Sequence, residues 1–279
     1  MKHTTKVMLA MVLMLSLLLA ACGKDENKAK EGTSDNGKAS NLLEEINERG
    51  VIKIGMMGTY APYNFLNEKK EMDGFDADIS KELAKHLGVE PEFIAQEFSG
   101  MIPSLQAGKF DIVVSQMTIT DDRKEQMDFT QPYITNEVKV IVVENNNDIK
   151  EKEDFVGKNI GVGLGTNDET YLRTVLMPEI GDFTIKTYDD VITSLKDLDA
   201  GRIDATINNL YALKPIIAEN GFKIKAVGKP VKADPAGVAA KKGNDELITA
   251  LNEALTQIKE DGTYKEIFKK WFGEEPPAE

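Results

Sequence analysis

One arginine in the middle of the chain follows a hydroxyl side chain at a spacing that suits the binding of a carboxylate. Thr118 and Arg123 come shortly after the strand-like run Asp111–Ser115. A guanidinium group can donate two parallel hydrogen bonds to a carboxylate, and a nearby hydroxyl can donate another. Arg123 could also be a surface residue paired with Asp121 or Glu125, and the residue types alone favour this second interpretation.

A glycine-rich stretch later in the chain is a second candidate for anion binding. Gly161, Gly163 and Gly165 precede Thr166 and Asn167, between a strand-like and a helix-like segment. The spacing is not the G-x-G-x-x-G pattern of dinucleotide-binding loops. Backbone N–H groups and the Thr166 hydroxyl could hold an anion at the start of the helix. A plain structural turn explains the same residues, and both interpretations remain open.

Two aromatic residues stand near turns and could contact a ligand. Tyr60 lies two residues before a proline, and Phe98 lies two residues before a glycine. Aromatic rings in loops can enclose the aliphatic part of a small molecule, although most aromatic side chains fill cores. Phe65 and Phe75 are therefore assigned to the core, whereas Tyr60 and Phe98 could have either role.

Residue combinations typical of enzymes and metal sites are largely missing. The chain has two histidines, of which His86 lies on a helix-like segment, and one cysteine, Cys22. There is no H-E-x-x-H pattern, no Cys/His cluster and no plausible cysteine nucleophile. The sequence therefore predicts no catalytic residue, no metal site and no cofactor. A formal net charge of −13 also argues against nucleic-acid binding, because an acidic surface repels phosphates.

The first part of the chain has the pattern of a leader and a tether. Basic residues precede a mainly apolar run over residues 7–19, which suits a secretory signal and is short for a bilayer span. Leu19-Ala-Ala-Cys22 resembles a bacterial lipobox, in which the cysteine is lipidated and the chain is cut before it. We therefore predict a signal peptide over residues 1–21, a lipid on Cys22, and a flexible tether over residues 22–41. The protein would be extracytoplasmic and anchored to the cell membrane.

The elements that must position these residues alternate between strand-like and helix-like segments. The clearest helix runs from Phe75 to Leu87 and is followed by Gly88, which suits a helix end. Thr120 or Asp121 could cap a short helix that contains Arg123. Such alternation predicts an α/β fold with largely parallel sheets. The expected strands are Val51–Gly55, Glu92–Gln96, Asp111–Ser115, Val138–Val143, Asn159–Val162 and Ile203–Ile207.

An internal repeat indicates two similar lobes, although one short match can also arise by chance. Leu105-Gln-Ala-Gly-Lys-Phe-Asp111 resembles Leu198-Asp-Ala-Gly-Arg-Ile-Asp204, about one small domain further along the chain. Ser115 and Asn208 then occupy equivalent places at the carboxyl ends of equivalent strands. Ligands in open α/β sheets bind just outside such ends. Two lobes that turn these ends toward each other would enclose a cleft.

Several longer motifs occur in a fixed order, and together they resemble a known family. The motifs are Tyr60-Ala-Pro-Tyr-Asn-Phe65, Gly74-Phe-Asp-Ala-Asp78, Ser99-Gly-Met-Ile-Pro-Ser-Leu-Gln-Ala-Gly108, Thr118-Ile-Thr-Asp-Asp-Arg123, Asp128-Phe-Thr-Gln-Pro-Tyr133, Gly161-Val-Gly-Leu-Gly-Thr166 and Asp261-Gly-Thr-Tyr-Lys-Glu-Ile-Phe-Lys-Lys-Trp-Phe-Gly273. From about residue 42 to residue 273, the chain resembles the type II solute-binding proteins of polar amino acid ABC importers, solute-binding protein family 3. No one motif is decisive, but the ordered set is highly specific.

The resemblance implies a two-lobed type II periplasmic binding protein fold. Each lobe would be a mostly parallel sheet flanked by helices, and two hinge strands would join the lobes. Lobe one would comprise residues 42–136 and 234–279, and lobe two residues 137–233. The implied function is capture of a small amino acid by a monomer and its delivery to the permease subunits of an ABC importer.

The resemblance also assigns ligand-binding roles to residues of both lobes. Arg123 is expected to bind the α-carboxylate of the ligand, with help from Thr118 and the backbone near Ser115. The rest of the expected site comprises a neighbour of that backbone, two aromatic residues, the helix start of lobe two and an asparagine pair: Gln116, Tyr60, Phe98, Gly163, Thr166, Asn167, Asn208 and Asn209.

One position departs from the family pattern. After the strand Asp204–Ile207 the family usually has an aspartate that holds the ammonium group of the ligand, whereas this chain has Asn208-Asn209. A neutral amide accepts a hydrogen bond without the ion-pair contribution. Met56-Met57-Gly58 also lacks the acidic residue expected for arginine or lysine. We therefore expect an uncharged polar or sulfur-containing ligand, such as cystine or glutamine.

Two other functions fit parts of the sequence. Secreted cyclohexadienyl dehydratases resemble this family and need a carboxylate acid in the cleft, for which Asp168 or Glu169 would have to serve. A surface lipoprotein with an adhesive or sensory role would also suit the tether, but it would leave a ligand cleft unexplained.

Overall fold

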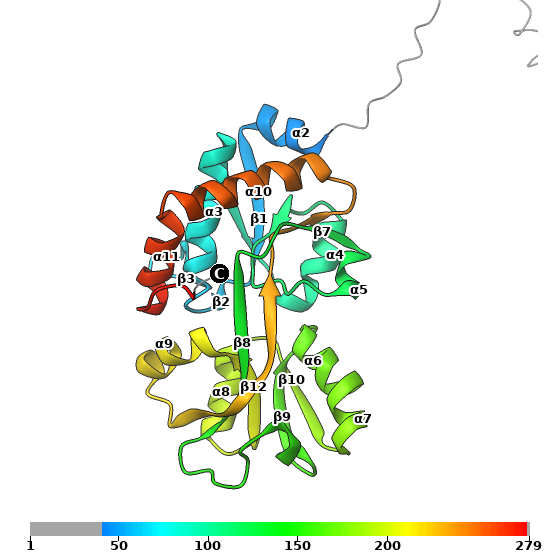
Figure 1. Ribbon diagram of the computed structural model, residues 1–279, viewed down its shortest axis with the longest axis vertical. Coiled ribbons are helices and arrows are strands. Elements are labelled where there is room, and N and C mark those ends of the chain that lie inside the picture. Colours follow the sequence, from blue (N-terminus) through cyan, green and yellow to red (C-terminus); the bar gives the residue numbers. More distant parts are fainter. Residues whose placement is uncertain (1–40, 278–279) are drawn as a thin grey trace, which may run out of the picture. The chain divides into compact units, whose positions relative to one another are not determined.

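The computed structural model describes residues 41–277, which form two α/β lobes, each built on a five-stranded sheet (Figure 1). The predicted α/β class and two-lobed arrangement are therefore confirmed. The predicted signal peptide, Cys22 and all but the last residue of the predicted tether lie outside the described residues.

The sheet of the first lobe has the strand order β5-β1-β6-β13-β7. The first three strands of that order are parallel, and β13 runs antiparallel to both β6 and β7. The strands are β1 (Val51–Met56), β5 (Glu90–Ala95), β6 (Ile112–Val113), β7 (Met127–Phe129) and β13 (Ala239–Lys241). The helices of this lobe are α2 (Leu42–Arg49), α3 (Phe75–Leu87), α4 (Met101–Gln106), α5 (Asp121–Lys124), α10 (Asp245–Glu260) and α11 (Thr263–Phe272).

A small three-stranded sheet leads from β1 into α3. Its strands are β2 (Thr59–Tyr60), β3 (Asn64–Leu66) and β4 (Met72–Asp73). Helix α3 has the predicted bounds and ends at Gly88, which has a φ of 73°. Phe75 is fully buried, as predicted for a core residue, whereas Phe65 is half-buried with its ring centre 5.8 Å from that of Trp271.

The sheet of the second lobe has the strand order β10-β9-β11-β8-β12. Strands β10, β9 and β11 are parallel, and β8 runs antiparallel to β11 and β12. The strands are β8 (Ile134–Val143), β9 (Asn159–Gly163), β10 (Thr184–Tyr188), β11 (Ala205–Asn209) and β12 (Ile224–Ala236). The helices are α6 (Asn167–Tyr171), α7 (Met177–Ile180), α8 (Val191–Asp199) and α9 (Leu210–Asn220), with a π-helical turn over Leu172–Leu176 between α6 and α7.

Strands β8 and β12 join the two lobes as a pair (Figure 1). They pair antiparallel over most of their length, from Ile134 opposite Ala236 to Val143 opposite Ile224, with a shift of register between Val227 and Lys232. Strand β8 begins earlier than the predicted Val138 because its first residues form this hinge. The pairing of β8 with β12 in the hinge joins residues that are far apart in the sequence, so local sequence patterns do not predict it.

The internal repeat has a structural counterpart in each lobe. After α4 and after α8 the chain turns through a glycine of positive φ, Gly108 or Gly201, and reaches an aspartate. Asp111 accepts a hydrogen bond at 2.7 Å from the N–H of Lys53 in β1, and Asp204 accepts one at 2.7 Å from the N–H of Asn159 in β9. Both aspartates therefore attach the next strand to the neighbouring strand of the same sheet.

Side chains of the two lobes also contact each other outside the hinge. Tyr211 of α9 packs against two rings of α11, with ring centres 5.3 Å from Phe268 and 5.2 Å from Phe272. Aromatic pairs at such distances contribute about 0.5–1.5 kcal/mol each beyond their area. A hydrogen bond of 2.6 Å joins the Tyr60 hydroxyl of β2 to Asn208 Oδ1 of β11. The described conformation is thus held closed by contacts of the protein itself.

Candidate functional site

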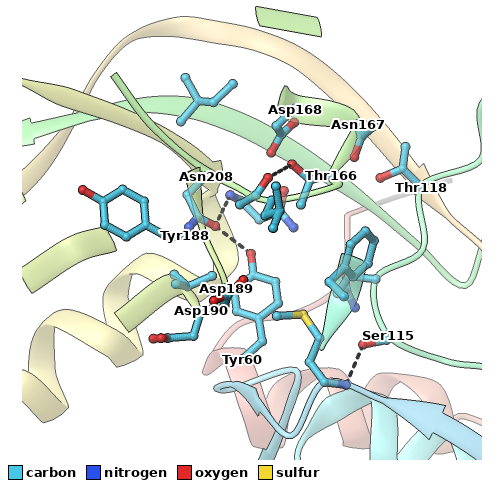
Figure 2. Close-up of a pocket in the computed structure, with 18 of the residues that line it drawn as sticks. Tyr60, Ser115, Thr118, Thr166, Asn167, Asp168, Tyr188, Asp189, Asp190 and Asn208 are labelled. Carbon is cyan, nitrogen blue, oxygen red and sulfur yellow. Dashed lines mark hydrogen bonds between the residues drawn. The ribbon is translucent and has the colours of Figure 1, made fainter. Parts of the chain in front are cut away.

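A polar pocket lies between the lobes, at the carboxyl ends of strands from both sheets (Figure 2). Its cavity of about 70 Å³ has room for roughly five to seven water molecules, which is the scale of a small solute. The lining residues are Met57, Tyr60, Phe98, Ser115, Gln116, Thr118, Gly163, Leu164, Thr166, Asn167, Asp168, Tyr188, Asp189, Asp190, Val191, Ile207, Asn208, Asn209 and Asp234. Ten of the eleven expected ligand-binding residues are among them, and Arg123 is the eleventh.

Arg123 lines a neighbouring hollow and not the pocket itself, and the two share Asn167 and Asp234. Only 6% of Arg123 is exposed. Its Nη1 donates a hydrogen bond of 3.0 Å to the carbonyl of Thr118, and its guanidinium lies 5.5 Å from the ring centre of Phe98. Burial lowers the pKa of Arg123 to about 10, although the charges of Asp168 and Asp234 oppose that shift.

The surroundings of Arg123 decide between the two interpretations of its sequence context. No carboxylate of residues 41–277 forms an ion pair with it, and Asp121 pairs instead with Lys124 at 3.1 Å. The surface-pair interpretation is therefore wrong. Thr120 caps α5 by accepting a hydrogen bond from the Arg123 N–H at 3.3 Å, as predicted. The cap and the short helix hold a guanidinium with several unused donors next to the pocket.

The hydroxyl of Thr118 is a second polar group that the protein leaves available. Thr118 is 6% exposed and lines the pocket, and none of the described residues forms a hydrogen bond with its hydroxyl. Ser115 is fully buried, and its hydroxyl accepts a hydrogen bond from the N–H of Met57 at 3.1 Å. Buried polar groups are normally paired, so the unused groups of Arg123 and Thr118 indicate a place for a polar ligand.

The glycine-rich stretch forms a tight turn before α6, and this turn touches the first lobe. Thr166 caps α6 by accepting from the N–H of Glu169 at 3.2 Å, and it donates to the carbonyl of Gly163 at 2.8 Å. Gly165 has a φ of 73°, and a Cβ there would lie 3.1 Å from the Cα of Ser99. A larger residue at position 165 would therefore press against the first lobe. The Thr166 hydroxyl is used within the turn, whereas Asn167 reaches across to Asp234.

Tyr60 and the asparagine pair form the opposite wall of the pocket. Asn208 Oδ1 accepts from the Tyr60 hydroxyl at 2.6 Å and from the N–H of Asn209 at 2.7 Å. Burial, and after it the negative charge of Asp168, raises the pKa of Tyr60 well above its usual value, so the hydroxyl stays protonated and donates. Asn209 also lines the pocket.

Gln116 lines the pocket, but its carboxamide points into the protein. Its Nε2 donates to Asp76 Oδ1 at 2.6 Å, and its Oε1 accepts from Asn136 Nδ2 at 2.8 Å. Its backbone has a φ of 52°, an unusual conformation for a residue other than glycine. The carboxamide bonds therefore hold the backbone of the pocket wall in place, and Gln116 offers the pocket backbone rather than side-chain groups.

Behind Gln116 a buried carboxylate collects several donors. Asp76 is fully buried and accepts from Asn64 Nδ2 at 2.6 Å, from Gln116 Nε2 at 2.6 Å and from the Tyr133 hydroxyl at 3.0 Å. Burial raises the pKa of Asp76 from 3.8 to about 7, because the loss of water outweighs these hydrogen bonds. These hydrogen bonds hold Gln116 in place and so stabilise the wall of the pocket from behind.

Sequence reasoning missed a charged cluster beside the pocket. Lys232 Nζ lies 2.7 Å from Asp168 Oδ1 and 2.6 Å from Asp234 Oδ2, and Asn167 Nδ2 donates to Asp234 Oδ2 at 2.8 Å. Burial, opposed by Lys232, raises the pKa of Asp168. Asp168 directly follows the helix start Thr166–Asn167, and this position could have indicated that Asp168 lines the pocket. Nothing local marks Lys232 and Asp234, since they reach the pocket only through the hinge strand.

Three further lining residues that were not predicted lie at the end of strand β10. Tyr188, Asp189 and Asp190 stand at its carboxyl end, and Asp190 caps α8 by accepting from the N–H of Thr193 at 2.8 Å. The strand-end rule that selected Ser115 and Asn208 would have selected this position too, had β10 been recognised as a strand. Its alternating Thr-Ile-Lys-Thr-Tyr sequence was the available signal.

Within residues 41–277 there is no group of three or more His, Cys, Asp or Glu side chains arranged to hold a metal ion. In the same part of the chain, no helix has the length and apolar character needed to cross a bilayer.

Two α/β lobes joined by two hinge strands, with a polar pocket closed between them, define the class of solute-binding proteins. The chain belongs to the bacterial extracellular solute-binding proteins, family 3, whose family model matches residues 52–274. The expected family membership is thereby confirmed. Members of this family bind solutes, so the prediction that the chain is not an enzyme is confirmed as well.

Similar proteins are named for amino acid binding. The L-cystine-binding protein TcyJ of Escherichia coli is 36% identical over 233 residues, covering 83% of this chain and 86% of TcyJ. The L-cystine-binding protein TcyA of Bacillus subtilis is 31% identical over 274 residues, covering 97% of this chain and 98% of TcyA. A solved structure of an ancestral arginine-binding protein bound to arginine has 38% identity and a TM-score of 0.76, covering 81% of this chain and 99% of that one.

Proposed function

We propose that this protein binds an uncharged polar or sulfur-containing amino acid, such as cystine or glutamine, in the interlobe pocket and delivers it to the permease subunits of an ABC importer. The observation that carries the proposal is the buried Arg123, whose guanidinium bonds to one carbonyl and has no carboxylate partner among the described residues. A ligand carboxylate would supply that partner, because guanidinium and carboxylate form two parallel hydrogen bonds. The available hydroxyl of Thr118 lies on the same wall.

Closure would couple binding to delivery. A ligand that contacts Arg123 and Thr118 from one lobe and Asn167 or Asn209 from the other touches both lobes only when they are closed. Such a ligand shifts an existing open–closed equilibrium toward the closed form. The closed form, presented to the permease, would then report that the pocket is filled. Similarity to two L-cystine-binding proteins supports cystine as the first ligand to test.

The cellular setting belongs to the same proposal. Residues 1–21 would be a lipoprotein signal peptide, Cys22 would carry the lipid, and residues 22–41 would tether the lobes to the outer face of the cell membrane. Residues 42–136 and 234–279 would move as one lobe and residues 137–233 as the other, in a monomer. The hinge pair Asn136–Asp234, where β8 lies opposite β12, falls at these proposed boundaries.

A thermal-shift screen tests the ligand. The protein lacking residues 1–22 keeps both sheets and their cores, and it would be screened against the twenty amino acids, cystine, small carboxylates and arogenate. A ligand at 100 times its Kd stabilises by about 2.7 kcal/mol, which for a protein of this size raises the melting temperature by about 5–10 °C. A clear shift with one amino acid supports the proposal. No shift with any amino acid, or a shift with arogenate alone, overturns it.

A further inference from the structure

Two of the four carboxylates that line the pocket are placed in its interior. Asp190 is used as the cap of α8, and Asp189 is exposed. In contrast, the side chains of Asp168 and Asp234 are 17% and 10% exposed. These two acids come from different elements, Asp168 from α6 and Asp234 from the hinge strand β12, and one ammonium group contacts both.

Lys232 contacts these acids from the side of the neighbouring hollow, which Arg123 also lines. It lines the neighbouring hollow together with Asp234, and it does not line the pocket. Its ammonium contacts Asp168 through Oδ1 and Asp234 through Oδ2. No described residue donates a hydrogen bond to the other oxygen of either carboxylate. Each acid therefore keeps one acceptor for something that is not part of the protein.

The position of Asp168 relative to the other pocket groups suits a small zwitterion. Figure 2 shows Asp168 beside Asn167 on the wall of the pocket. Through Lys232 it is joined to Asp234, which lines both the pocket and the hollow that Arg123 lines. The pair of acids therefore lies next to the proposed carboxylate site, as the ammonium of an amino acid lies next to its carboxylate.

We propose that Asp168 and Asp234 form the subsite for the cationic nitrogen of the ligand, with Lys232 as their built-in counter-ion. The inference rests on the proposed function, because it presumes a ligand carboxylate at Arg123. The two acids and the two bases, Arg123 and Lys232, sum to zero charge. A zwitterion leaves that sum unchanged, whereas a ligand without its ammonium adds an uncompensated negative charge to a largely buried site.

The subsite also explains how the pocket can hold an ammonium group without an aspartate at position 209. Asn209 can accept a hydrogen bond from the ammonium group, whereas the ion pair with that group is formed by Asp168 and Asp234. Selection of the ligand would then depend on the balance between two acids and Lys232. Removal of an acid should weaken the demand for an ammonium, and removal of Lys232 should create a demand for additional positive charge.

The experiment compares matched ligand pairs by isothermal titration. The pairs are L-cystine with 3,3′-dithiodipropionic acid, L-glutamine with glutaramic acid, and L-arginine with 5-guanidinopentanoic acid, each acid lacking the α-amino group. The variants are Asp168→Asn, Asp234→Asn and Lys232→Met, with Asp182→Asn as the control. Asp182 is exposed, lies outside the pocket, and makes no side-chain hydrogen bond with the described residues. Melting curves of each variant without ligand check its folding.

The expected result is a loss of discrimination in both acid variants. The wild type and Asp182→Asn should prefer the amino acid to its des-amino partner by about 100-fold or more, and Asp168→Asn should reduce this ratio by about 30-fold. Lys232→Met should shift the preference by about tenfold toward L-arginine relative to L-glutamine. If the wild type binds an amino acid and both acid variants keep the ratio within about threefold, the subsite is wrong and the proposed function stands. If the wild type binds no amino acid, both proposals are overturned.

Discussion

Replacement of Arg123 by methionine separates a binding role from a structural one. Methionine retains much of the length of the side chain and removes the charge. Arg123 is 6% exposed, so its guanidinium has lost most of its hydrogen bonds to water. The hydrogen bond to the Thr118 carbonyl replaces only one of them. A structural arginine in such a place would be paired with a carboxylate, and loss of it would unfold the protein at a lower temperature.

The effect on stability follows from opposing contributions. The lowering of the Arg123 pKa to about 10 corresponds to roughly 3 kcal/mol of unfavourable free energy for the charged form, which is fully present at pH 7. Methionine removes this penalty. It also removes the hydrogen bond to Thr118 and the contact with the Phe98 ring, together worth about 2–3 kcal/mol. The free energy of unfolding without ligand should therefore stay the same or rise by about 1 kcal/mol.

The effect on binding should be far larger. Loss of one partner of a buried, hydrogen-bonded charge pair costs about 2–5 kcal/mol, which weakens the affinity by roughly 30-fold to several thousand-fold. Thermal unfolding without ligand and isothermal titration with the best ligand measure the two effects on the same preparation. For a protein of this size the melting temperature should change by no more than about 4 °C.

A matched control is Arg202→Met. Arg202 pairs with Asp197 at 2.7 Å, is 66% exposed in its side chain, and lies outside the pocket. That variant should keep both the melting temperature and the affinity. A fall of more than about 6 °C for Arg123→Met would show that the arginine supports the fold, and retained affinity within threefold would show that it does not bind the ligand. Either outcome refutes the reasoning.

Three further predictions concern the buried carboxylate behind the pocket wall and two contacts between the lobes. Folding raises the pKa of Asp76 from 3.8 to about 7, so the native state binds the carboxyl proton more tightly than the unfolded state does. The free energy of unfolding should therefore fall as the pH rises from about 4 to about 7. Urea unfolding at several pH values should show this slope in the wild type and a flatter one in Asp76→Asn. Tyr211→Ala removes the ring contacts with Phe268 and Phe272 of α11. Small-angle scattering without ligand should then show more of the open form, and the ligand affinity should fall about tenfold. Tyr60→Phe removes the 2.6 Å bond to Asn208 and should weaken ligand affinity by about three- to tenfold in titration. An unchanged scattering curve or affinity would contradict the last two.

The fold could be predicted in detail wherever the signals are local. Helix α3 follows from its apolar spacing and from Gly88 at its end, and its observed bounds are the predicted ones. The repeated Leu-x-Ala-Gly-x-x-Asp pattern encodes the same turn twice, because a glycine of positive φ and an aspartate that accepts from a neighbouring strand are both needed there. Two copies of one turn indicated two similar lobes, in agreement with the fold that the family resemblance implied.

The candidate site was predictable where the strand ends and helix starts could be read from the sequence. Thr120 caps the helix that carries Arg123, as its capping pattern indicated, whereas Thr166 was expected at a helix start as an anion-binding hydroxyl and proves to cap that helix. The burial of Arg123 was not visible, since the residues around it come from α6 and β12, far away in the sequence. The composition of the segment suits a surface ion pair equally well, and only the tertiary structure excludes it.

Lys232 and Asp234 of the hinge strand could not be predicted, for a related reason. Lys232 and Asp234 lie on a strand with no glycine turn or capping motif at that point, and their contact with Asp168 depends on the pairing of β12 with β8. That pairing changes register between Val227 and Lys232. A shift of one residue would turn Lys232 to the other face of the strand, so the charged cluster is a property of the hinge geometry.

The hinge register is also where the two walls of the pocket are attached. Asn136 of β8 lies opposite Asp234 of β12. Asn136 donates to the carboxamide of Gln116, which holds the first-lobe wall, and Asp234 accepts from Asn167, which belongs to the second-lobe wall. Bending of the hinge therefore moves groups that are bonded directly to pocket residues of both lobes. A ligand that orders those residues acts on the hinge through two hydrogen bonds on adjacent strands, so recognition and closure share one set of side chains.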